Sequence, residues 1–168
     1  MACAHGLRPW HAATNRKEVM KQVFLNTDGG SRGNPGHAGI GFVLCDESGV
    51  EICAGGDYIG TATNNIAEYT AMLWGLQNAI NAGATHVVAR ADSELMVKQL
   101  NGIYRVKNEG LKPYFADIRA LATKFENIEF VHVYREANKK ADEMANIAMD
   151  AKGSCGNALI AWETSTLF

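Results

Sequence analysis

A segment with helical periodicity stands between the third and fourth strand-like segments of the sequence, and this order strongly restricts the possible folds. Apolar side chains recur at helical spacing over residues 65–82, and an apolar run typical of a buried strand follows at 85–91. A helix in that position forces a crossover connection, which is almost always right-handed. The fourth strand is therefore expected to lie parallel to the first and beside it, so that the ends of the two strands are neighbours.

Three strand-like segments precede the crossover helix. Apolar and polar residues alternate over residues 22–28, and two further strand candidates occupy 40–45 and 50–58. The first two segments are separated by a glycine-rich run at 29–36, which we interpret as a turn, and the last two by a tight turn at 47–49. We expect these strands to form an antiparallel meander.

The rest of the chain predicts two helices, a fifth strand and a final helix, at residues 93–100, 113–125, 128–134 and 138–152. The predicted fold class is therefore α/β, with a five-stranded mixed sheet of three antiparallel strands and then parallel strands, and with helices on both faces.

The length of 168 residues suits one domain, which we assign to residues 21–152. Residues 1–20 lack hydrophobic periodicity and are expected to be a disordered extension. The tail at 153–168 is expected either to dock on the domain or to stay loose.

Composition narrows the classes of function. No apolar run approaches the length of a membrane span, and the four cysteines show no paired spacing typical of zinc sites, so we expect reduced thiols in a cytoplasmic protein. The net charge is -2, so the overall charge does not indicate a nucleic-acid binder. A nuclease with this composition must hold phosphates through metal ions and local basic loops.

Four acidic residues are candidate site residues, and the predicted topology brings at least two of them together. Asp28 closes the first strand and Asp92 closes the fourth, at the sheet edge where open α/β sheets bind ligands. Glu68 is placed in the first turn of the crossover helix and Asp142 in the first turn of the last helix. Four converging carboxylates would raise one another's pKa values unless cations lay among them.

Oxygen ligands of this kind suit Mg²⁺, with Mn²⁺ as a substitute. Two such ions can activate a water on one side of a phosphodiester and stabilise the leaving oxygen on the other, so no side-chain nucleophile is required.

Each acid also has a purely structural explanation. Asp28 precedes two glycines and suits a turn, Glu68 suits a capping box with Asn65, Asp92 suits a helix cap, and Asp142 suits the dipole of its helix. The joint arrangement favours the metal site, because the topology brings Asp28 and Asp92 together independently of these roles.

Four ordered motifs resemble the type 1 ribonuclease H family over about residues 21–151. They are TDGGSRGNPG at 27–36, TNNIAE at 63–68, ADS at 91–93 and REANKKAD at 135–142. The resemblance implies a ribonuclease H-like fold and a two-metal site formed by Asp28, Glu68, Asp92 and Asp142. It also implies hydrolysis of the RNA strand of RNA–DNA hybrids, leaving 5′-phosphate and 3′-hydroxyl ends.

The resemblance further implies a set of substrate contacts: Gly29, Gly30, Asn34, Thr63, Asn64 and Asn65. Glycines let the backbone approach the minor groove, where the 2′-hydroxyl distinguishes RNA from DNA.

The sequence departs from many members of the family in two respects. A histidine that assists catalysis often precedes the last acid, but His132 lies in a predicted strand, and we favour Arg135 for that role. Residues 101–112 carry few basic residues, which resembles the prokaryotic and archaeal-like branch that lacks a basic protrusion.

Other functions remain open from the sequence. The same site could cleave double-stranded RNA, the fold could be a catalytically silent hybrid-binding module, or the metals could serve a phosphatase of small substrates. The expected partner is an RNA–DNA hybrid, with no membrane and no small-molecule cofactor, and the expected state is a monomer.

Overall fold

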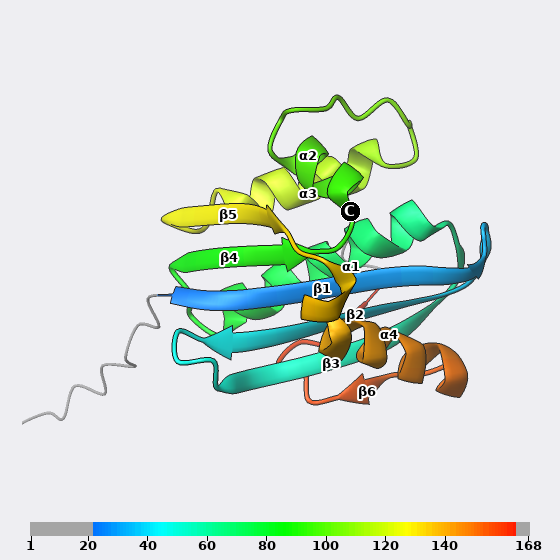
Figure 1. The fold of residues 1–168 in the computed structure, drawn as a ribbon, viewed down its shortest axis with the longest axis horizontal. Helices are drawn as coiled ribbons and strands as arrows, with labels where there is room; N and C mark the ends of the chain where they lie inside the picture. The colour runs from blue at the N-terminus through cyan, green and yellow to red at the C-terminus, as the bar shows by residue number, and fades with distance from the viewer. Residues whose placement is uncertain (1–21, 164–168) are drawn as a thin grey trace, which may run out of the picture.

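A computed structural model describes residues 22–163, so the predicted disordered extension at 1–20 lies outside the described residues. A mixed sheet lies between two layers of helices (Figure 1). Its strands are β1 (Gln22–Gly33), β2 (Gly36–Asp46), β3 (Glu51–Ala62), β4 (His86–Ala91), β5 (Asn127–His132) and β6 (Cys155–Gly156). The helices are α1 (Asn64–Asn81), α2 (Glu94–Leu100), α3 (Lys112–Ala122) and α4 (Lys139–Ala151), with a 3₁₀ turn at Arg135–Ala137.

The strand order is β5-β4-β1-β2-β3-β6. β1, β2 and β3 form the predicted antiparallel meander, and the crossover through α1 brings β4 back parallel to β1. The predicted mixed sheet with helices on both faces is confirmed, but it has a sixth member, because the two-residue β6 pairs with β3.

The interpretation of residues 29–36 as a turn is wrong. β1 continues through the glycine-rich run and stays paired with β2 from Val23 to Gly33, so the turn contains only Asn34 and Pro35. Gly33 has a φ of +102°, which suits glycine at the point where the chain reverses. One glycine of the run, Gly29, is needed because α1 packs closely against it.

The two helical layers approach the sheet at glycines. A Cβ at Gly29 would lie 2.2 Å from the backbone of Ala67 in α1, and a Cβ at Gly41 would lie 2.2 Å from the carbonyl oxygen of Ala141 in α4. α1 therefore packs on one face of the sheet and α4 on the other (Figure 1). Alternate β1 residues such as Leu25 are fully buried on the α1 face.

The described part of the tail docks on the domain, which settles the open alternative for residues 153–163. The side-chain oxygen of Asn78, fully buried in α1, accepts hydrogen bonds from the backbone of Leu159 at 2.8 Å and Ile160 at 3.1 Å. The indole nitrogen of Trp74 donates to the carbonyl oxygen of Ile160 at 2.8 Å. The tail thus satisfies buried polar groups of α1.

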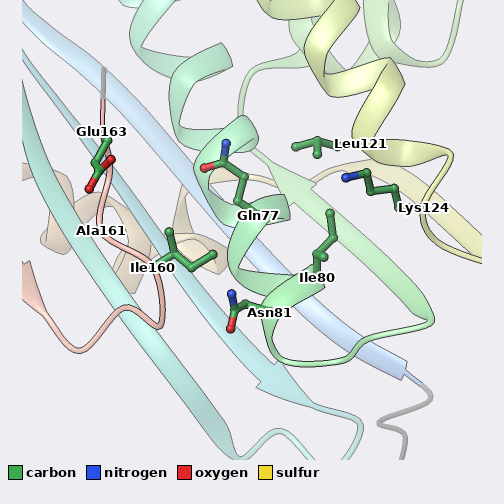
Figure 2. A pocket seen from close by; sticks show the side chains of 8 residues that line it. All are labelled: Gln77, Ile80, Asn81, Leu121, Lys124, Ile160, Ala161 and Glu163. Atoms are coloured by element: carbon green, nitrogen blue, oxygen red, sulfur yellow. The ribbon is translucent and has the colours of Figure 1, made fainter. Parts of the chain in front are cut away.

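The docked tail also encloses a hollow of about 380 Å³ with the last turns of α1 and the end of α3 (Figure 2). Ile160 comes from the tail, Ile80 from α1 and Leu121 from α3. None of the four predicted acids lines this hollow.

No helix within residues 22–163 combines the length and the apolar character that a membrane span requires.

The contacts of Asn78 lead to a stability prediction. Asn78→Ala should lower the free energy of unfolding by about 1–3 kcal/mol, because two backbone N–H groups of the tail lose their acceptor. The matched control Asn81→Ala changes an exposed residue of the same helix and should cost less than about 0.5 kcal/mol. Urea denaturation measures both, and equal losses would contradict the assigned role of Asn78.

Candidate active site

Asp28 and Asp92, the first two acids of the candidate site, lie at the carboxyl end of β4. The last parallel pair between β1 and β4 is Thr27 with Ala91, and Asp28 and Asp92 are the next residues on each strand. Thr27 is buried on the α1 side of β1, so Asp28 points to the opposite side, which α4 covers. Asp28 and Asp92 are therefore neighbours, as predicted, but Asp28 does not close the first strand, because β1 continues to Gly33.

Asp142 reaches the same place from α4. The side chain of Asn138, which is only 1% exposed, donates to the backbone oxygen of Thr27 at 2.9 Å and accepts from the side chain of Asn26 at 3.1 Å. These bonds fix the start of α4 against β1. Asn146 then donates to a carboxylate oxygen of Asp142 at 3.2 Å.

Glu68 approaches from α1, on the other side of the sheet. The predicted capping box is wrong, because Thr63 and not Asn65 caps α1, accepting a hydrogen bond from the backbone of Ile66 at 3.2 Å. Glu68 consequently lies in the second turn of the helix and not in the first. Its side chain hydrogen-bonds Ser93 and has no capping role.

One cavity of about 370 Å³ joins the four acids. The lining residues are Asp28, Gly29, Gly30, Ser31, Arg32, Asn64, Glu68, Asp92, Arg135, Asp142, Ala145, Asn146 and Met149. The cavity is open to solvent, so an extended polymer can reach the acids.

Two carboxyl groups in this cavity, those of Asp28 and Glu68, resist ionisation. Burial, together with the nearby Asp92 and Asp142, raises the pKa of Asp28 from its ordinary 3.8 to about 8, and burial is the largest of these causes. Burial also raises the pKa of Glu68 from 4.5 to about 7, with Asp92 adding to the rise and the hydrogen bond from Ser93 opposing it. A bound cation would remove this electrostatic cost.

The donor set fits a hard divalent cation, because all four candidate ligands are carboxylates. Within residues 22–163, however, no three acidic, histidine or cysteine side chains already form a ligand set. The metal site at Asp28, Glu68, Asp92 and Asp142 therefore stays a prediction supported by electrostatics.

The two candidates for the assisting residue lie in different places. Arg135 lines the cavity, with its Nε 3.8 Å from a carboxylate oxygen of Asp92. His132, at the end of β5, is not among the lining residues, and its ring meets Tyr134 edge-on with 5.4 Å between centroids. The geometry supports the preference for Arg135.

The polar residues among the predicted substrate contacts lie around the β1–β2 turn and the start of α1. Asn34 accepts from the backbone of Asn64 at 3.2 Å, and Asn64 accepts from the backbone of Ser31 at 2.7 Å, so both asparagines join the β1–β2 turn to α1. With the Thr63 cap, these bonds hold the turn against the start of α1, and the substrate contacts of these residues stay a prediction. Asn65 is half-buried and is not among the lining residues.

The two glycines of the motif also differ. Gly29 is needed because α1 packs against it, whereas a Cβ at Gly30 would meet no described atom within 4 Å. Gly30 therefore faces open space in the cavity and is the glycine that a nucleic acid can approach.

Reasoning from the sequence missed several residues of the site, namely Arg32, Ser93, Asn138 and Asn146. Arg32 and Ser93 belong to recognised motifs but were not assigned a role. Asn138 was noted only as a helix start, and its position in the motif beside Asp142 was the available signal.

Comparison with known proteins agrees with this geometry. A family model described as "Reverse transcriptase-like" matches residues 26–148, which include all four acids. Ribonuclease HI of Halobacterium salinarum is 42% identical over 129 residues, covering 77% of this chain and 65% of the relative. The chain belongs to the type 1 ribonuclease H family.

Two further relatives define how far the likeness extends. Bifunctional protein Rv2228c of Mycobacterium tuberculosis is 43% identical over 132 residues, which cover 77% of this chain but only 36% of the relative. The structure of LC11-RNase H1 in complex with RNA/DNA hybrid is 43% identical with a TM-score of 0.74, and the match covers 77% of this chain and 98% of that one. The chain thus spans about a third of the length of Rv2228c and nearly all of a ribonuclease H structure.

The segment between α2 and α3 is consistent with the expected branch of the family, which lacks a basic protrusion. Residues 101–111, between α2 and α3, form turns and irregular backbone with no additional helix. A basic helical protrusion is therefore absent from this described segment.

The raised pKa of Asp28 leads to a prediction about pH and metal. Its carboxyl group keeps a proton up to about pH 8 in the folded protein but only up to about pH 4 when unfolded, so stability falls as pH rises between these values. Mg²⁺ needs ionised carboxylates, and we expect it to raise the thermal unfolding midpoint more at about pH 9 than at about pH 5.

Thermal unfolding with and without Mg²⁺ measures this effect. Asp28→Asn should remove most of the difference between the two pH values. Glu47→Gln should preserve it, because this exposed acid lies in the hairpin beyond Asp46, which pairs with the opposite end of β1. Equal stabilisation of the unaltered protein at both pH values would argue against a cation site among these acids.

Proposed function

We propose that this chain is an endoribonuclease that hydrolyses the RNA strand of RNA–DNA hybrids, leaving 5′-phosphate and 3′-hydroxyl ends. The observation that carries the proposal is the meeting of four carboxyl groups from β1, α1, the end of β4 and α4 in one open cavity. The likeness to Ribonuclease HI and to a ribonuclease H1 in complex with RNA/DNA hybrid supports the same activity.

The proposed cofactor is a pair of Mg²⁺ ions, for which Mn²⁺ can substitute, held by Asp28, Glu68, Asp92 and Asp142. When bound, such a pair supplies an activated water and charge stabilisation at the leaving oxygen of a phosphodiester.

The residues of the chain orient these ligands. Asn138 anchors α4 to β1, Asn146 orients Asp142, and Ser93 orients Glu68, so that the carboxyl groups of Asp142 and Glu68 have a defined direction before substrate arrives. Arg135, 85% exposed at the rim, is placed to contact the reacting phosphate and to offset charge near Asp92.

The surface beside the acids suits the minor groove of a hybrid. Gly30 exposes its backbone in the cavity, and Asn64 stands next to it at the start of α1. A backbone approach at this point can test for the 2′-hydroxyl, which distinguishes the RNA strand.

The alternatives from the sequence give different outcomes in one assay. A silent hybrid-binding module would bind without cleavage, and a nuclease specific for duplex shape would cut double-stranded RNA as well. Presence of all four acids in the cavity opposes the silent module. Cytoplasmic location and the monomeric state stay predictions. The three cysteines within the described residues form no disulfide.

The decisive experiment follows the two strands of a labelled hybrid separately in the presence of Mg²⁺, with duplex RNA and duplex DNA as comparison substrates. Cleavage confined to the RNA strand of the hybrid is the expected result. Cleavage of the DNA strand, or none of either strand, would refute the proposal.

The acids give a prediction for activity. Loss of a residue that hydrogen-bonds a metal ligand typically lowers activity roughly 10–100-fold. Asp28→Asn and Asp92→Asn change proposed ligands themselves and should each lower the cleavage rate by more than that. Hybrid binding and folding should be retained, and Glu47→Gln should cleave normally. Unimpaired turnover in both site variants would remove these carboxylates from the mechanism.

The rim gives a second prediction. Arg135→Ala should slow cleavage by about tenfold or more, because a charge-assisted contact to phosphate is lost. His132→Ala should change the rate by less than about threefold, since the ring lies against Tyr134 outside the cavity. Single-turnover rates measure both variants, and the reverse ranking would assign the role to His132.

A further inference from the structure

A second arginine lines the cavity at a distance from the acids. Arg32 lies four residues after Asp28 on β1 and therefore points to the same face of the sheet. A strand rises about 3.3 Å per residue, which places the two residues roughly 13 Å apart along the strand. Among the described lining residues, Arg32 and Arg135 are the two that carry positive charge.

The present partner of Arg32 is a carboxylate. Its guanidinium nitrogen lies 2.7 Å from Oδ1 of Asp150, near the end of α4, with the two side chains 49% and 69% exposed. Exposed ion pairs contribute only about 0–1 kcal/mol to stability. The close packing of α4 at Gly41 and Gly39 positions the helix without this pair.

We propose that Arg32 binds a backbone phosphate of the nucleic acid, a few nucleotides from the reacting phosphate, and exchanges Asp150 for it. This inference rests on the proposed function, because it extends the same cavity along the substrate. Guanidinium groups bind phosphate and carboxylate oxygens with the same paired geometry, so Asp150 occupies the position of the phosphate until substrate displaces it. Asp150 is then a competitor of the substrate.

The proposal makes opposite predictions for the two members of the pair. Arg32→Ala should raise KM for hybrid roughly five- to tenfold with little change in kcat, and should lower the slope of binding against salt concentration by about one. Asp150→Asn should lower KM by about twofold or more, because the competitor is removed. A purely structural ion pair would instead make both variants change in the same direction.

The control is Lys124→Ala, which removes one positive charge near the other hollow, beside the last turns of α1 (Figure 2). It should leave KM within about twofold of the unaltered protein. Thermal midpoints of all three variants, measured alongside, show whether a KM change reflects folding.

Steady-state cleavage gives kcat and KM for each variant. The anisotropy of labelled hybrid, measured without added metal, gives the binding affinity. Suppose that the unaltered protein cleaves normally. If Arg32→Ala then leaves KM and affinity unchanged, or if both pair variants change KM in the same direction, the role of Arg32 is overturned while the proposed function stands. Absence of cleavage by the unaltered protein would overturn the proposed function, while the anisotropy series still decides whether Arg32 contacts nucleic acid.

Discussion

The site depends on the different lengths of two neighbouring strands. β4 leaves the sheet at Ala91, while β1 continues to Gly33 with β2 as its remaining described neighbour, and Figure 1 shows β1 running on past the end of β4. An edge therefore opens at Asp28. Side chains from both helical layers can meet around this edge, whereas a β4 of equal length would keep the layers apart.

Glycines at the closest contacts between layers decide where the helical acids lie. Gly29 meets α1 at Ala67, the residue before Glu68, and Gly41 meets α4 at Ala141, the residue before Asp142. Gly41 is also the β2 partner of Asp28. A side chain at either glycine would force one helix away from the sheet and would move its acid with it. The close packing of the helices at these glycines therefore also brings the acids together.

Order and periodicity were enough to predict the crossover, the pairing of β1 with β4 and the meeting of Asp28 with Asp92, because these follow from local patterns and general rules of topology. The predictions that failed or stayed open depended on distant partners. The glycine-rich run was interpreted as a turn because its contact with α1 is invisible in local composition. The docking of the tail depends on Asn78, whose bond to Leu159 joins residues 81 positions apart.

The electrostatics of the cavity explain why positive residues stand at its rim. The chain has a net charge of -2 and gathers carboxyl groups where the proposed function requires a polyanion to bind, so attraction cannot come from the overall field. The proposed cations among the acids would reverse the local charge at the centre, but they would leave the flanking phosphates without partners. Arg135 at one side of the acids and Arg32 farther along β1 supply fixed positive charge there, at positions that neither the fold nor the buried core requires.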